Sequence, residues 1–212
     1  KEAGVKCDDA HDNSDKYEFT KFKTGVMALR LNTPFTSKAL MTVIEDEMHA
    51  IDTNVETLTL LWIMIDTLND MLQRGLTVRG VVNMGRYLRQ YGDHIDFNKL
   101  DKWLGKIYLR RTAQLQGSIL VTLFGFEKDE LPFVRRIEPT AKKLAIKSLT
   151  DSLNDPVGEW HFKISSTGFV KNNGSAFKRN LQRSLRLMPY TPIEATGNII
   201  TNFVRSLAEI EE

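Results

Sequence analysis

The chain has 212 residues, a formal net charge of +2, and ordinary fractions of apolar (42%) and charged (26%) residues. This composition excludes fibrous, collagen-like and disordered chains and is typical of one globular domain, with an appendage at most. The single cysteine, Cys7, excludes a disulfide within the chain and favours a reducing, intracellular setting. The longest apolar run, 58–65, is far shorter than the roughly 20 residues that a membrane span needs.

The first part of the chain predicts a leader, a strand and a helix. Residues 1–16 are polar and mainly acidic, which is typical of a flexible leader. Apolar residues alternate along 18–31 and occupy both faces of its second half. We therefore expect a strand inside a sheet, ended by Pro34. A first helix follows, with Thr36 or Ser37 as its cap.

A second helix over 53–75 is the best-defined element of the sequence. Thr53 and Glu56 have the spacing of a capping box, and Gly75 stands where a left-handed residue would end the helix. Between them lies a broad apolar stripe at helical spacing. This helix is expected to be the most buried.

The later elements alternate between predicted strands and helices. A short strand is expected within 76–88, where three glycines interrupt the pattern. Asp96 is positioned to cap a helix, and 111–126 and 158–170 are rich in strand-forming residues. Between these two strands, Pro139 fits the first turn of a helix.

The predicted fold class is therefore α+β, with a small central, mostly antiparallel sheet and helices packed on one side. One core domain covers 17–186, and an amphipathic C-terminal helix over 187–212 is appended to it. That helix is expected to start at Thr191-Pro192-Ile193-Glu194, which combines a cap, a proline at the first helical position and a returning glutamate.

The charges are segregated along the sequence. Residues 45–70 contain seven acids and no Lys or Arg, whereas 74–111 contain nine bases and three acids. Two shorter basic bands follow: 135–147 has five bases and one acid, and 171–186 has five bases and no acid. Such bands attract phosphate groups of nucleic acid or of an anionic bilayer, and they let copies of one chain attract each other. The plainer interpretation is that each band is an ordinary solvated face.

The candidate contacts to a membrane or a nucleocapsid are basic residues of the last two bands: Lys171, Lys178, Arg179, Arg183, Arg186, Arg135, Arg136, Lys142 and Lys143.

The sequence contains no strong catalytic, cofactor or metal motif, so we expect no enzyme, no cofactor and no small-molecule substrate. Glu45 and His49 could share a metal, but no third ligand is spaced nearby. Asp93 and His94 could form an acid/base pair, but no nucleophile motif accompanies them. The glycines and arginines of 79–86 resemble a phosphate cradle only loosely.

Two segments resemble parts of a known family. Residues 22–35, Phe-Lys-Thr-Gly-Val-Met-Ala-Leu-Arg-Leu-Asn-Thr-Pro-Phe, are similar to the first core strand and turn of rhabdovirus matrix proteins. Residues 114–122, Gln-Leu-Gln-Gly-Ser-Ile-Leu-Val-Thr, resemble the long later strand of that family. The order of elements agrees over about 17–170. The lysine-rich leader and the Pro-Pro-x-Tyr motif of the animal-virus members are absent from this sequence, so a divergent, plant-infecting member fits better.

The resemblance implies a non-enzymatic viral structural protein. Such a matrix protein self-associates beneath the viral envelope, binds anionic membrane from the cytoplasm or nucleus of the host cell, and holds the ribonucleoprotein during budding. The candidate self-association residues combine the Pro-Phe turn with the opposed charge bands: Pro34, Phe35, Glu45, Glu47, Arg86 and Arg89.

Two alternatives stay open from the sequence. The first is a nucleocapsid or coat-type protein that binds nucleic acid through the basic bands and through Tyr87, Tyr91, Trp103 and Tyr108. The second is an unrecognised enzyme that uses Asp93, His94 and neighbouring arginines.

Overall fold

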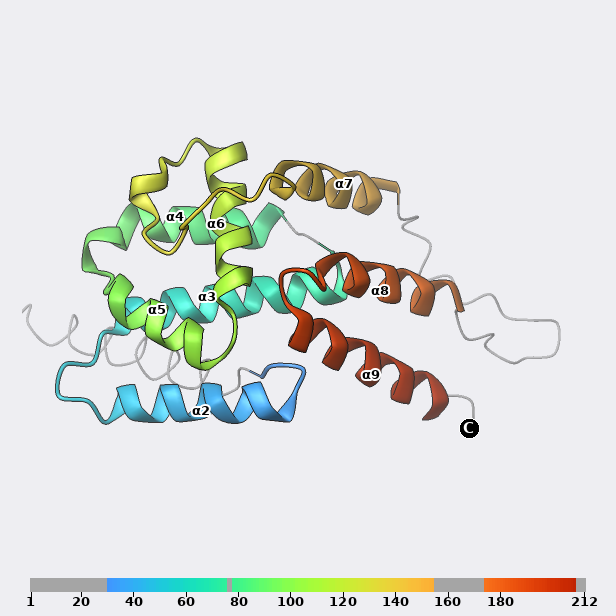
Figure 1. The fold of residues 1–212 in the computed structure, drawn as a ribbon, viewed down its shortest axis with the longest axis horizontal. Helices are drawn as coiled ribbons and strands as arrows, with labels where there is room; N and C mark the ends of the chain where they lie inside the picture. Colours follow the sequence, from blue (N-terminus) through green and yellow to red (C-terminus); the bar gives the residue numbers. More distant parts are fainter. Residues whose placement is uncertain (1–29, 76–77, 155–173, 209–212) are drawn as a thin grey trace, which may run out of the picture.

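All regular structure in the part of the chain that the structure describes is helical (Figure 1). The computed structural model describes residues 30–75, 78–154 and 174–208. The helices are α2 (Pro34–Met48), α3 (Val55–Gln73), α4 (Val78–Tyr91), η1 (Gly92–His94), α5 (Phe97–Lys106), α6 (Arg110–Phe124), η2 (Lys128–Glu130), α7 (Ala141–Asn154), α8 (Gly174–Leu187) and α9 (Pro192–Ala208).

Helix α3 lies at the centre of the molecule and packs against α4, α5, α6 and α8 (Figure 1). The prediction that it is deeply buried is confirmed, since Leu60, Ile65, Leu68 and Leu72 have no exposed surface. Removing these apolar side chains from water supplies much of the stability of such a core.

The predicted capping box of α3 is displaced by one residue. Asn54 is the N-cap, and its side chain accepts a hydrogen bond of 2.7 Å from the Thr57 amide. Thr53 instead donates its hydroxyl to the carbonyls of Glu47 and Ala50, in the turn from α2. The predicted left-handed end is confirmed at Gly75, where φ is +91°.

The prediction of an α+β fold with a central sheet is wrong, because the described residues contain no strand. The clearest case is 111–126, which lies almost wholly in α6. Its apolar residues satisfy both a two-residue and a four-residue period, so the sequence pattern does not separate a strand from a helix. Tertiary contacts favour the helix: Gln116 is fully buried there and donates to the Met64 carbonyl of α3.

The short strand expected within 76–88 is also wrong, because 78–88 belongs to α4. Its glycines allow close helix packing. A Cβ atom at Gly80 would lie 2.9 Å from Thr67 Oγ1 of α3, and one at Gly85 would lie 3.0 Å from Leu120 Cδ2 of α6. Since these residues sit inside a helix, they do not form a phosphate cradle.

The other predicted strands lie outside the described residues, apart from Arg30 and Leu31, which have no regular structure. Pro34 does not end a strand there; it is the first residue of α2, whose cap is Thr33. The cap expected at Asp96 is confirmed, since its side chain accepts hydrogen bonds from the amides of Asn98 and Lys99.

The start of α9 is built into the body of the protein. Pro192 is the first helical residue, as predicted, but Thr191 Oγ1 has no hydrogen-bond partner among the described residues, so the predicted capping box does not form. Glu194 is fully buried and reaches the beginning of α2 instead. Asn198 donates to the Leu72 carbonyl and to Ser184 Oγ, which joins α9 to α3 and α8.

Among the described helices, none combines the length and apolar character that crossing a membrane requires.

Candidate functional site

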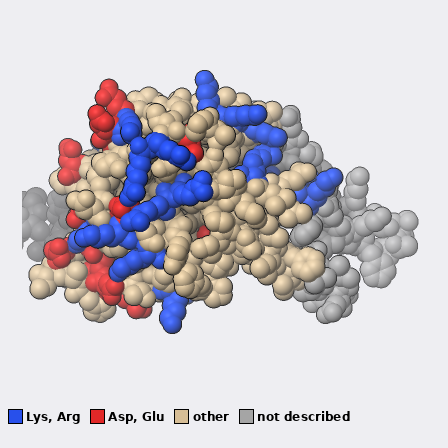
Figure 2. All heavy atoms as spheres, viewed as in Figure 1, with Lys and Arg blue, Asp and Glu red and all other residues tan. Residues whose placement is uncertain are grey.

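Lysine and arginine side chains gather across one face of the molecule (Figure 2). In this view the acidic side chains lie mainly along the left edge. Two hollows are lined by basic residues. We use the name basic strip for the basic residues that line or join them: Arg110, Arg111, Arg135, Arg136, Lys143, Lys147 and Arg186.

The first hollow lies between the start of α6 and the segment before α7. It has a volume of about 230 Å³, and its charged lining consists of Asp101, Arg110, Arg111 and Arg135. Asp101 binds Arg110 through two hydrogen bonds, Nε to Oδ1 at 3.0 Å and Nη2 to Oδ2 at 2.8 Å. Arg135 Nη2 approaches the same carboxylate at 3.5 Å. One acid therefore orients two arginines, while the exposed Arg111 has no acidic partner among the described residues.

The second hollow lies between α7 and the turn that joins α8 to α9. Its volume is about 270 Å³, and its charged lining consists of Lys143, Lys147 and Arg186, without an acid. Tyr190 and Thr140 close one side, and their hydroxyl groups are hydrogen-bonded to each other. The three cations come from two helices that are far apart in sequence, so the tertiary structure alone brings them together.

Direct contacts join the two hollows. Thr112, in the first turn of α6, donates its hydroxyl to the carbonyl of Tyr190 at 3.2 Å. Gln114, which lines the first hollow, donates to the buried Glu138, and Arg136 Nε lies 3.4 Å from the same carboxylate. The segment between the hollows is thus held by internal hydrogen bonds, and the charge of Glu138 is met within the protein.

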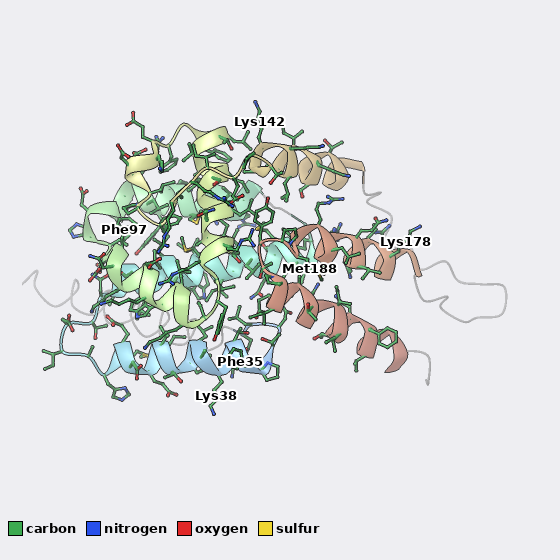
Figure 3. The ribbon with its side chains drawn as sticks, in the orientation of Figure 1. Phe35, Lys38, Phe97, Lys142, Lys178 and Met188 are labelled. Carbon is green, nitrogen blue, oxygen red and sulfur yellow. The ribbon has the colours of Figure 1, made fainter. Side chains whose placement is uncertain are left out.

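The predicted contact residues fall into several groups. Arg135, Arg136, Lys143 and Arg186 belong to the basic strip. Lys142 and Lys178 are exposed on α7 and α8 (Figure 3).

The remaining predicted contact residues are placed differently. Arg183 Nη1 donates to the Gln73 carbonyl at 3.1 Å, at the end of α3. Arg179 is half-buried on α8. Lys171 lies outside the described residues.

The contact residues predicted from the sequence do not include Arg110, Arg111 and Lys147. They belong to basic bands, but no local signal separates them from their neighbours. The pair Arg110-Arg111 is the best such signal, because two adjacent cations open α6 and both are exposed.

The predicted self-association residues do not share one environment. Pro34, Phe35, Glu45 and Arg86 are exposed. Arg89 is also exposed, but its guanidinium carbon lies 4.6 Å from the centre of the Phe126 ring, a cation–π contact within the subunit.

Glu47 is buried and serves an internal contact. Its Oε1 accepts hydrogen bonds from the Asn54 amide at 2.8 Å and from Lys99 Nζ at 3.1 Å. Lys99 also lies 3.2 Å from Asp52 Oδ2, and its hydrogen bond lowers the pKa of Asp52. The acidic band is therefore partly neutralised by α5 of the same chain.

Replacing Lys99 by alanine is expected to lower the free energy of unfolding by about 1–2 kcal/mol, since Glu47 would keep a buried carboxylate without its cation. Urea unfolding followed by circular dichroism measures the change. Lys102→Ala is the matched control: it removes an exposed lysine of the same helix that has no acidic partner in the described residues, so a change below about 0.5 kcal/mol is expected. Equal losses in the two variants would contradict an ion-pair role for Lys99.

The residues considered for catalysis do not gather into a site. Asp93 and His94 are exposed in η1 and line neither hollow. The His49 ring contacts the Glu45 backbone carbonyl at 2.7 Å. Within the described residues, no group of three or more His, Cys, Asp or Glu side chains is placed to hold a metal.

Comparison with known proteins identifies no relative: no family model, no curated protein and no solved structure matches this chain. The resemblance to rhabdovirus matrix proteins remains an expectation from short sequence segments. The helix at 110–124 differs from the strand which that resemblance implies there.

Proposed function

We propose that this protein is a non-enzymatic structural protein that binds the phosphate backbone of single-stranded nucleic acid, as a nucleocapsid or coat-type subunit does. The observation that supports it is the basic strip with its two adjoining hollows. Three sequence segments far apart along the chain (110–111, 135–147 and 186) contribute cations to these two hollows, and the hydrogen bond from Thr112 to Tyr190 joins the elements that carry them.

The arrangement suits a chain of phosphates better than a single small anion. Arginine presents a planar fork of donors that matches phosphate oxygens, and lysine adds mobile point charges. The first hollow offers arginines and the second mainly lysines, so successive phosphates of one strand can be met at both places. Binding of this kind is independent of base sequence and depends strongly on salt.

The strip keeps an excess of positive charge after its internal ion pairs are counted. Arg110 and Arg135 share Asp101, and Arg136 approaches Glu138. Arg111, Lys143 and Lys147 have no acidic partner among the described residues. These three are therefore the side chains whose removal tests phosphate binding with least effect on the fold.

The test uses the full chain and a fluorescent single-stranded oligouridylate, with binding followed by anisotropy. If about six cations contact phosphates, log K should fall against log salt with a slope of about −4. Removal of three of them in Arg111→Ala/Lys143→Ala/Lys147→Ala is expected to reduce that slope by about 2.

The control Arg79→Ala/Arg86→Ala/Lys128→Ala removes the same charge from exposed positions outside the strip. We expect it to keep most of the slope. Absence of binding at low salt would overturn the proposal. Equal losses in both triple variants would show that net charge, and not the strip, determines binding.

A second candidate, a matrix-type protein that binds anionic membrane, is favoured by one observation. On α9, Ile200, Phe203 and Val204 are spaced for a single helix face and each is more than half exposed. Vesicles of phosphatidylserine and phosphatidylcholine test it by cosedimentation. Salt-sensitive binding that Ile200→Ser/Val204→Ser abolishes would support this function. A chain that ignores such vesicles at low salt would exclude it.

A further inference from the structure

Phe35 on α2 (Figure 3) forms an exposed aromatic pair with Tyr108, which lies between α5 and α6. Their ring centroids are 5.5 Å apart and the rings are tilted by 40°. Phe35 is 60% exposed and Tyr108 is 56% exposed. Aromatic side chains usually provide stability by burial, so two exposed rings in contact call for another explanation.

The backbone at Tyr108 is strained. Its φ of +60° is in the left-handed region, and no other non-glycine residue in the described part of the chain has a positive φ. A bulky residue in this conformation is uncommon, since its Cβ crowds the backbone, and such strain is concentrated at functional sites. Glycine would adopt the same turn without cost. Here the turn carries a tyrosine whose ring points outward.

Three cations lie close to the pair along the chain. Lys38 is one helical turn beyond Phe35 on α2, and Lys106 and Arg110 are each two residues from Tyr108. All three are exposed. Arg110 also belongs to the basic strip and lines the first hollow. Tyr108 is therefore two residues along the chain from the basic strip, which begins at Arg110.

We infer that the Phe35–Tyr108 pair is a stacking platform for a base of the bound single strand. This inference rests on the proposed function, because the basic strip must hold the backbone for a base to reach the rings. Every base offers a π-face, so stacking adds affinity without sequence preference. The neighbouring cations hold the adjacent phosphates.

The decisive experiment crosses two changes, one in the protein and one in the ligand. The protein change is Phe35→Ala/Tyr108→Ala. The ligand change replaces an oligouridylate by an oligomer with the same number of phosphates and abasic sugars. With the base-containing strand, the double variant is expected to bind about 5- to 100-fold more weakly, and the salt slope should stay unchanged because no charge is lost. With the abasic strand, wild type and variant should bind equally.

Two further variants separate stacking from other roles. Phe35→Leu/Tyr108→Leu keeps apolar area but removes the rings, so it should weaken base-dependent binding nearly as much as alanine. Phe203→Ala removes another half-exposed aromatic, on α9 and away from the basic strip, and should leave affinity unchanged. Circular dichroism with thermal unfolding checks that each variant is folded.

The outcomes separate the two proposals. Stacking would be overturned if the double alanine variant bound both ligands more weakly by the same factor, or if the double leucine variant bound the base-containing strand as tightly as wild type. Phosphate binding would stand in either case. Salt-dependent binding that does not respond to loss of the rings would likewise overturn stacking alone. Absence of wild-type binding to either ligand would overturn both.

Discussion

Replacing Glu194 by alanine is expected to lower the free energy of unfolding by about 3 kcal/mol. Its side chain is fully buried at the start of α9 and accepts three hydrogen bonds from the start of α2. The donors are the Asn32 amide at 2.6 Å, the Thr36 hydroxyl at 2.5 Å and the Thr33 hydroxyl at 3.3 Å. Alanine would remove the acceptor of the Asn32 amide, and it would leave the buried Thr36 hydroxyl with Thr33 as its remaining partner.

Urea unfolding measures the loss, and hydrogen exchange at the first amides of α2 locates it. Glu194→Gln retains one acceptor oxygen and nearly the same volume, so an intermediate loss is expected, and this variant keeps the test informative if alanine prevents folding. Glu45→Ala removes an exposed acid from α2 and should change stability by less than about 0.5 kcal/mol. A Glu194→Ala protein as stable as this control would contradict the role of Glu194 in joining α9 to the start of α2.

Replacing Gly117 by valine is expected to cost about 2–3 kcal/mol, because α6 has no room for a side chain at this position. A Cβ atom there would lie 2.3 Å from Val134 Cγ2 and 2.8 Å from Phe133 Cε2. Both contacts belong to the segment that leads to Arg135 and Arg136. The substitution should therefore also displace the first hollow and weaken oligouridylate binding.

Gly92→Val is the matched control for Gly117→Val. No atom outside its immediate neighbours lies within 4 Å of a Cβ at Gly92, and its φ is not in the left-handed region. We expect a change below about 0.5 kcal/mol and unaltered binding. Thermal unfolding and anisotropy on both variants check the pair. Similar losses would show that the valine side chain itself, and not the contact with the 133–134 segment, is responsible.

Helix positions were predictable where the signal is local. Asp96 and Pro192 mark helix starts through short-range hydrogen bonding and a fixed φ, and Gly75 marks an end through its left-handed backbone. These features depend on a few consecutive residues. The long apolar stripe of α3 is equally local, and its burial was predicted correctly.

The class of the fold was not predictable, because it does not depend on local signals alone. Along 110–124, β-branched and apolar residues fit a strand as well as a helix. The choice depends on partners far away in the sequence, such as the Met64 carbonyl that receives Gln116, and the 133–134 side chains that cover Gly117. An isolated segment contains no information about these partners.

The candidate site likewise combines features that are visible in the sequence with features that depend on packing. The sequence by itself determined that the chain has segregated acidic and basic bands. Only the tertiary structure decided which cations meet, because contacts such as Thr112 to Tyr190 and Gln114 to Glu138 place α6, α7 and the α8–α9 turn beside one another. It also decided that Glu47 is internal and that Phe35 contacts Tyr108. Composition and short-range order are properties of consecutive residues, whereas a binding surface is made by residues that packing brings together across the chain.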